Sequence, residues 1–329
     1  MKDILNQLFN HEVLSREKAK DVLLKISHGE YNEIQIASFI SVYQMRLITV
    51  AELQGFRDAL LALCVPFDAG GMDTIDIVGT GGDGKNTFNI STTSAVVVAG
   101  AGYKVSKHGS YGVSSNVGSS NVLTALGYEF TNDRDTLLKQ LDEANICFLH
   151  APIFHPALKA VVPIRKQMGM KTFFNMLGPL VNPVQPKWQL YGTYSMELSR
   201  LYQYLMQEEE GRAFSVIYAL DGYDEVSLTG AFKLRSRNKE QILTPDDLNL
   251  PTYQQTDLFG GDTAEEAAII FQNILKNEAT PAQRDAVIAN AGLAIHCIKP
   301  ESKLLDCLAE AKESIVSGSG LNVLHKLLK

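Results

Sequence analysis

Residues 79–92 read G-T-G-G-D-G-K-N-T-F-N-I-S-T, directly after the β-branched run of residues 74–78. This order predicts a short strand, a glycine-rich loop and a helix over residues 92–101. Glycines let backbone N–H groups approach an anion closely, and N-I-S-T places further N–H and hydroxyl groups at the start of the helix. The stretch therefore predicts an anion-binding unit in an α/β domain.

Two nucleotide-binding motifs overlap in this loop. Gly79, Gly81 and Gly84 satisfy G-x-G-x-x-G, but a dinucleotide fold needs an acid about 20 residues later, and residues 100–104 contain none. G-x-x-x-x-G-K also fits, but Asn86 stands where a P-loop needs Ser or Thr, and Asp83 would repel a triphosphate. We reject the first motif and disfavour the second. A plain capped turn does not explain so many turn residues in succession.

Residues 107–120, K-H-G-S-Y-G-V-S-S-N-V-G-S-S, repeat the design after a strand expected at residues 103–106. Lys107 adds a positive charge, and serines add hydroxyl donors. Loops at the carboxyl ends of parallel strands face one crevice, so both loops are expected at one ligand site. His108 is either a site residue or a structural loop histidine, and the sequence leaves both open.

Two further segments carry candidate ligand groups. Residues 221–225, D-G-Y-D-E, follow a strand expected at 214–220 and fit either a Mg²⁺ site or a solvated acidic turn. The two phosphate-type loops favour the Mg²⁺ site. Arg165 is a candidate for bidentate binding of a carboxylate, although alone it would be a surface residue. Pro163 before it is expected to end or kink a helix.

The first 65 residues predict three helices, which start after Ser15, Asn32 and Thr49. A hinge is expected after them, at residues 66–71. Strands and helices alternate beyond the hinge. We therefore expect a small all-helical N-terminal domain joined to a large α/β domain, whose mostly parallel central sheet is flanked by helices.

Composition limits the remaining function classes. The chain has 329 residues, 45% of them hydrophobic, and a formal net charge of -7. These values describe a globular protein and argue against nucleic-acid binding. The longest apolar stretch, residues 95–102, is too short for a bilayer, so no membrane partner is expected. Four scattered cysteines predict neither disulfides nor a zinc site, which indicates the cytoplasm.

The motifs together resemble the anthranilate phosphoribosyltransferase family. The matching segments are G-T-G-G-D-x-x-x-T-F-N-I-S-T, K-H-G with the serines after it, A-P-x-x-H-P-A, N-x-L-G-P-L-x-N-P and D-G-x-D-E, and the likeness covers nearly the whole chain. The resemblance implies transfer of the phosphoribosyl group of PRPP to anthranilate in tryptophan biosynthesis, with Mg²⁺, two ions being expected. It also implies the fold of type II nucleoside phosphorylases and a homodimer formed through the helical domain.

The resemblance also implies domain limits and site residues. A helical domain of residues 1–65, with 165–185 packed against it, would accompany an α/β domain of residues 72–164 and 186–329. Mg²⁺ would be held by Ser91, Asp224 and Glu225, and anthranilate by Gly79, His108, Ser110 and Arg165. The residues implied around PRPP are Gly79, Gly82, Asp83, Thr87, Asn89, Ile90, Ser91, Thr92, Lys107, Ser115 and Ser119.

Two positions depart from the family pattern, which usually reads K-H-G-N-R. Ser110 is shorter than the usual asparagine, and Tyr111 removes a positive charge, so acceptor identity and PRPP affinity stay open. Three alternatives follow: transfer to another aromatic amine, a nucleoside-phosphorylase-like reaction that needs no metal pair, and a non-catalytic binding protein.

Overall fold

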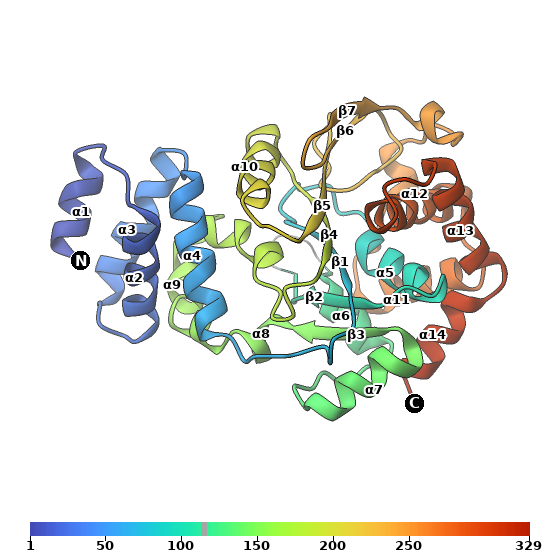
Figure 1. Ribbon diagram of the computed structural model, residues 1–329, viewed down its shortest axis with the longest axis horizontal. Helices are drawn as coiled ribbons and strands as arrows, with labels where there is room; N and C mark the ends of the chain where they lie inside the picture. Colours follow the sequence, from blue (N-terminus) through green and yellow to red (C-terminus); the bar gives the residue numbers. More distant parts are fainter. Residues whose placement is uncertain (113–116) are drawn as a thin grey trace. The chain divides into compact units, whose positions relative to one another are not determined.

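The structure, a computed structural model, describes residues 1–112 and 117–329. They form two compact units, each of which is described here by itself (Figure 1). The first unit contains Met1–Phe67 and Ala151–Gln185, and the second contains Asp68–His150 and Pro186–Lys329.

The first unit, all of whose residues are described, is helical throughout. Four helices rather than the predicted three precede residue 66. Helix α1 escaped the sequence analysis because it is only eight residues long and begins without a side-chain cap. The elements of this unit are α1 Lys2–Phe9, α2 Arg16–Ser27, α3 Glu33–Met45, α4 Val50–Leu63, α8 Ala151–Phe154, η1 Pro156–Ala160, α9 Val162–Met168, η2 Phe173–Met176 and η3 Gly178–Leu180.

The three predicted helix starts are confirmed. The side chains of Ser15, Asn32 and Thr49 each accept a hydrogen bond from the backbone N–H three residues later. Asn32 and Thr49 also form the reciprocal half of a capping box. Each such cap contributes about 1 kcal/mol by satisfying N–H groups that the helix leaves unpaired.

An aromatic cluster explains why a distant segment joins this unit. Phe173 stacks on Phe56 at 4.7 Å between ring centroids and meets Phe39 and Tyr43 edge-on. The expectation that residues up to 164 belong to the α/β domain is wrong, because the segment from Ala151 packs with α2, α3 and α4. Earlier in that segment, the Val65 N–H donates to the Phe154 carbonyl at 2.8 Å.

Pro163 begins a helix rather than ending one. It lies in the first turn of α9, where a helix has no partner for the N–H that proline lacks. Arg165 therefore belongs to a short helix that Gly169 terminates in the left-handed conformation.

Stability of the helical unit should fall as the medium becomes acidic. His155 is buried and donates from Nε2 to the Val181 carbonyl at 2.8 Å, and burial lowers its pKa to about 4. Unfolding frees the imidazole to take a proton at its ordinary pKa near 6.5, so acid favours the unfolded state. Between pH 7 and pH 5 we expect this residue alone to remove about 2 kcal/mol of unfolding free energy.

Denaturant titrations at the two pH values test this expectation. The His155→Gln variant keeps an N–H donor but has no titrating group, so its loss of stability between pH 7 and pH 5 should be smaller by that amount. An identical pH dependence in the wild-type and variant chains would contradict the role given to His155.

The second unit is built on a seven-stranded sheet of order β3-β2-β1-β4-β5-β6-β7. The first five strands in that order pair in parallel, and β6 and β7 pair antiparallel. The predicted mostly parallel sheet is confirmed. The strands are β1 Ile75–Gly79, β2 Val105–Gly109, β3 Ile146–His150, β4 Trp188–Gly192, β5 Ala213–Ala219, β6 Phe232–Arg235 and β7 Glu240–Leu243.

Helices cover both faces of this sheet. Figure 1 shows α10 on one face and α5, α11, α12, α13 and α14 on the other. The helical elements are α5 Ile90–Gly100, α6 Ser119–Ala125, α7 Arg134–Ala144, α10 Met196–Gln207, η4 Pro245–Leu248, η5 Gln255–Leu258, α11 Ala264–Leu275, α12 Pro281–Ile298, α13 Leu304–Val316 and α14 Ser319–Leu327.

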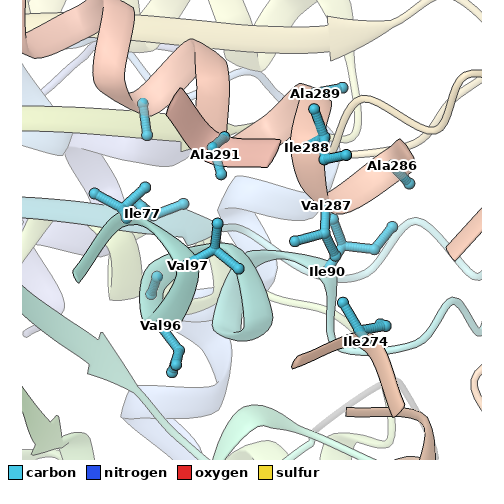
Figure 2. Close-up of a cluster of buried hydrophobic side chains, with 14 of the residues drawn as sticks. Ile77, Ile90, Val96, Val97, Ile274, Ala286, Val287, Ile288, Ala289 and Ala291 are labelled. Atoms are coloured by element: carbon cyan, nitrogen blue, oxygen red, sulfur yellow. The ribbon is translucent and has the colours of Figure 1, made fainter. Parts of the chain in front are cut away.

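The main core lies where α5 and α12 pack on each other and on the sheet. Figure 2 shows Val97 of α5 and Ala291 of α12 close to Ile77 of β1. Small side chains on α12 allow close helix contact, and each buried valine or isoleucine stabilises the unit by about 1.5–3 kcal/mol. This packing fixes the start of α5, where the glycine-rich loop ends. In the described residues, no helix is long and apolar enough to cross a membrane.

Candidate active site

Three connecting segments meet at the carboxyl edge of the parallel strands. β1 leads into the glycine-rich loop, β2 into the serine-rich segment and β5 into the acidic turn at residues 221–225. Ligands of open α/β sheets bind at this edge.

The acidic turn is docked directly on the glycine-rich loop. The Gly81 N–H donates to Asp224 Oδ2 at 2.6 Å, and the Ser91 N–H donates to Glu225 Oε1 at 3.0 Å. Segments more than 130 residues apart in the chain thus meet at the start of α5. The structure brings together all three residues implied as metal ligands: Ser91, Asp224 and Glu225.

Two paired glycines make room for this turn. Gly79 ends β1, and Gly192 lies opposite it at the end of β4. A Cβ atom on Gly79 would lie 2.3 Å from Asp224 Oδ2, and one on Gly192 would lie 1.6 Å from the Asp224 carbonyl oxygen. Gly192 was not among the site residues expected from the sequence.

The Asp224 and Glu225 carboxyl groups lack sufficient neutralising charge. Burial and the nearby Asp83 carboxylate raise the pKa of Asp224 to about 7. Burial, followed by repulsion from Asp224, raises the pKa of Glu225 well above its usual range. A cation at these oxygens would favour the charged forms of both groups.

These residues fit Mg²⁺ as part of its coordination shell. In the described part of the chain, no three His, Cys, Asp or Glu side chains gather closely enough to form a metal site. Two adjacent carboxylates and a hydroxyl suit Mg²⁺ nevertheless, because this ion usually takes one or two carboxylates and completes its shell with water and substrate phosphate.

Lys107 lies in a strand rather than in the predicted loop, since β2 extends to Gly109 in register with β3. Its buried ammonium donates to the Ile77 carbonyl at 2.7 Å. Burial lowers its pKa, while Asp76 and Glu225 act in the opposite direction. His108 is also buried in β2, where its backbone N–H donates to the buried Asp76 carboxylate at 3.2 Å.

The start of α5 combines backbone donors with a free hydroxyl. Ile90, Ser91 and Thr92 form its first turn, and the buried Thr92 Oγ1 has no hydrogen-bond partner among the described residues. The Asn89 side chain does not cap this helix; it donates to the Val117 carbonyl at 3.2 Å. Asn89 therefore links the two predicted phosphate loops.

The remaining predicted PRPP residues occupy different parts of the two loops. Gly82 lies in the glycine-rich loop with a φ of 81°, and Asp83 accepts from the Lys85 N–H at 3.1 Å. Thr87 forms an isolated β-bridge with Phe259. Ser119 begins α6 and donates from Oγ to the Ser110 carbonyl at 3.1 Å. Ser115 lies outside the described residues.

Arg165, in the helical unit, keeps part of its donor set available. Nη2 donates to Asn175 Oδ1 at 3.1 Å, and the guanidinium lies 5.3 Å from the Phe174 ring centroid. Buried Nε has no partner among the described residues, and burial lowers the pKa of the group. A planar guanidinium with spare donors is suited to bind a carboxylate in bidentate geometry.

Family models and known proteins match nearly the whole chain. A family model described as "Glycosyl transferase family, helical bundle domain" matches residues 2–64, and one described as "Glycosyl transferase family, a/b domain" matches residues 71–321. An anthranilate phosphoribosyltransferase of Cytophaga hutchinsonii is 56% identical over 329 residues, with 100% of both chains covered. The chain belongs to the anthranilate phosphoribosyltransferase family.

Solved structures of anthranilate phosphoribosyltransferases share the fold. The Thermus thermophilus enzyme has a TM-score of 0.92 at 31% identity, with 98% of each chain covered. A Saccharomyces cerevisiae enzyme in complex with PRPP and Mg has a TM-score of 0.91 at 27% identity, covering 98% of this chain and 95% of that one. The predicted fold class and the resemblance to the anthranilate phosphoribosyltransferase family are confirmed.

Proposed function

We propose that this protein transfers the phosphoribosyl group of PRPP to the amino nitrogen of anthranilate and releases pyrophosphate, a step of tryptophan biosynthesis. The observation that carries the proposal is the docking of Asp224 and Glu225 on the glycine-rich loop. It combines anion-binding backbone with metal-binding carboxylates, as a polyphosphate substrate requires. Membership of the anthranilate phosphoribosyltransferase family supports the same reaction.

The proposed PRPP site uses the edge of the sheet. Backbone N–H groups of the glycine-rich loop other than that of Gly81, which already donates to Asp224, would donate hydrogen bonds to phosphate oxygens, and the Thr92 hydroxyl would add a donor. Lys107 supplies positive charge from β2. The full set is Gly79, Gly82, Asp83, Thr87, Asn89, Ile90, Ser91, Thr92, Lys107, Ser115 and Ser119.

We assign Ser91, Asp224 and Glu225 to Mg²⁺, with two ions expected when PRPP is bound. Bound Mg²⁺ would neutralise charge that builds on the departing pyrophosphate. The carboxylates hold their place through the Gly81 and Ser91 N–H groups. The Saccharomyces cerevisiae complex with PRPP and Mg supports use of the metal. Counting bound Mg²⁺ at saturating PRPP would test the number of ions.

The remaining chemistry requires positioning more than proton transfer. An aromatic amine is uncharged near pH 7, so attack on the anomeric carbon needs no strong base. The protein would place the amine in line with the C–O bond that breaks and stabilise the leaving pyrophosphate with Lys107 and fixed N–H groups. Such donors are effective because they are already oriented before the reaction begins.

For the acceptor we propose contacts with Gly79, His108, Ser110 and Arg165. Arg165 would bind the carboxylate of anthranilate, since its guanidinium retains donors beyond the one used on Asn175. Ser110 presents one hydroxyl where the family usually has an asparagine amide, so it offers the acceptor substrate fewer hydrogen-bond donors.

We also propose a homodimer formed through the helical unit. A groove of about 630 Å³ lies on α1 and α3, lined by residues that include Phe9, Ile34 and Met45. These apolar side chains are exposed by 61%, 79% and 91%. Exposed patches of this kind mark protein interfaces, and a second copy of the chain is the occupant we propose.

Sedimentation equilibrium tests this surface. Met45→Glu should shift the mass from dimer toward monomer by placing a charge in the apolar contact, while Lys18→Glu, outside the groove, should not. A monomeric wild-type protein, or a Met45→Glu variant that stays fully dimeric, would exclude this surface as the dimer interface.

Product analysis separates the proposed reaction from its alternatives. Anthranilate consumed and pyrophosphate released should agree one to one, and removing Mg²⁺ should stop both. A nucleoside-phosphorylase-like enzyme would use inorganic phosphate and a nucleoside without the metal. We expect this reaction to take place in the cytoplasm, consistent with four free cysteines; cell fractionation that recovered the protein elsewhere would contradict that expectation.

A further inference from the structure

The two ends of the segment that joins β2 to α6 are tied to one side chain. Asn121 Oδ1, in the first turn of α6, accepts hydrogen bonds from the Gly112 N–H at 3.1 Å and from the Gly118 N–H at 3.0 Å. The residues between these glycines include 113–116, which lie outside the described residues. Asn121 therefore joins the two ends of this segment at its base.

The backbones of the two ends are also in direct contact, at Gly118 and Gly112. A Cβ atom on Gly118 would lie 2.1 Å from the Gly112 nitrogen and 2.6 Å from the Tyr111 carbonyl carbon. The Gly118 φ of −85° is one that any residue can adopt, so the need for glycine here is steric. This close approach is independent of the two hydrogen bonds to Asn121.

The β2 end of the segment has supports of its own. The Ser110 carbonyl accepts from Ser119 Oγ and from the Ser120 N–H, both at 3.1 Å. The Tyr111 ring meets the buried His150 ring edge-on at 4.9 Å, and Ser120 Oγ lies 2.9 Å from His150 Nδ1. Loss of the Asn121 acceptor would therefore release Gly118 more than Ser110.

We propose that Asn121 is a positioning residue for PRPP. By accepting from both glycine N–H groups, it fixes Gly118 and so sets where the Ser119 hydroxyl lies relative to β2. Asn121 acts through Ser119 and does not touch the substrate. The inference rests on the proposed function, in which Ser119 is a PRPP contact.

Two substitutions of Asn121 separate the acceptor from the rest of the side chain. Asn121→Leu removes the acceptor at similar volume, and two lost hydrogen bonds should raise the KM for PRPP about tenfold. The kcat and the KM for anthranilate should stay within about threefold, because the Ser110 carbonyl keeps the hydrogen bond from the Ser120 N–H. Asn121→Asp retains an acceptor oxygen and should restore the wild-type KM for PRPP.

Gly118→Ala provides a second test if the leucine variant does not fold. A methyl group at Gly118 must push the two ends apart, so this variant should show the same selective rise in the KM for PRPP. Thermal unfolding of each variant reports separately on stability. Calorimetric titration with PRPP and Mg²⁺ should give a matching loss of affinity.

The outcomes distinguish this inference from the function on which it rests. A wild-type chain that does not use PRPP would remove the proposed function. If the wild-type chain uses PRPP and both Asn121→Leu and Gly118→Ala keep its KM, only the role of Asn121 is overturned. An equal rise in the KM for both substrates, or an aspartate variant as impaired as the leucine variant, would also overturn it.

Discussion

Asp224→Asn is expected to reduce kcat/KM for PRPP at least about a hundredfold while leaving the protein folded. The amide retains an oxygen that can accept from the Gly81 N–H, so the turn keeps its place. It loses the negative charge that would hold Mg²⁺. Steady-state kinetics at several Mg²⁺ concentrations should show a higher metal requirement together with the lower rate.

Although Asp224→Asn should lower activity, it should leave the stability of the folded protein unchanged or raise it. Burial raises the pKa of Asp224 to about 7, so the ionised form is disfavoured in the folded protein relative to the unfolded chain. A neutral amide avoids this cost, and the metal-free variant should unfold at the same temperature as the wild type or above it. A variant that lost activity by unfolding would not support the metal-binding role.

The matched control is Asp221→Asn in the same turn. Asp221 is exposed and accepts a hydrogen bond from the Thr229 hydroxyl rather than from the glycine-rich loop. Its kcat/KM for PRPP should stay within about threefold of wild type. If Asp221→Asn and Asp224→Asn lost kcat/KM for PRPP equally, the effect would come from the total charge of the turn and not from the carboxylate docked on the glycine-rich loop.

Arg165→Ala is expected to raise the KM for anthranilate about fiftyfold, because hydrogen bonds between charged groups contribute about 1.5–3 kcal/mol each. The KM for PRPP should change little. The KM for anthranilate of Arg165→Lys should lie between those of the wild type and Arg165→Ala, since an ammonium keeps the charge but lacks the planar fork of donors. Initial rates with each substrate varied in turn measure both constants.

Lys166→Ala is the control for charge and helix position. Lys166 is the exposed neighbour of Arg165 in α9 and should have no effect on either KM. Arg165 also contacts Asn175 and the Phe174 ring, so thermal unfolding must accompany the kinetics. A normal KM for anthranilate in Arg165→Ala, or a rise confined to PRPP, would refute the assigned role.

Local patterns and the mostly parallel character of the sheet could be predicted from the sequence. Helix caps depend on residues three apart, so Ser15, Asn32 and Thr49 identified their helices. The expectation that the glycine-rich and serine-rich loops lie at one edge followed from the rule that ligands bind at the carboxyl ends of parallel strands. Only the family resemblance placed the acidic turn with Ser91. Residues far apart in the chain reach that edge because their strands end there.

Features that depend on tertiary packing could not be predicted in this way. Nothing local indicates that the segment from Ala151 joins the helical unit, which depends on Phe173 filling an aromatic cluster built by distant helices. Lys107 and His108 resemble loop residues in sequence, and only pairing with β3 makes them strand. The antiparallel edge strand β7 was missed because it has only four residues, of which only the last two are apolar.

Mixing the protein with PRPP, Mg²⁺ and anthranilate and following anthranilate fluorescence tests the proposed reaction itself. We expect a loss of fluorescence that requires PRPP, stops when Mg²⁺ is chelated and is matched by the release of an equal amount of pyrophosphate. No loss with anthranilate, together with turnover of another aromatic amine or of inorganic phosphate with a nucleoside, would contradict it.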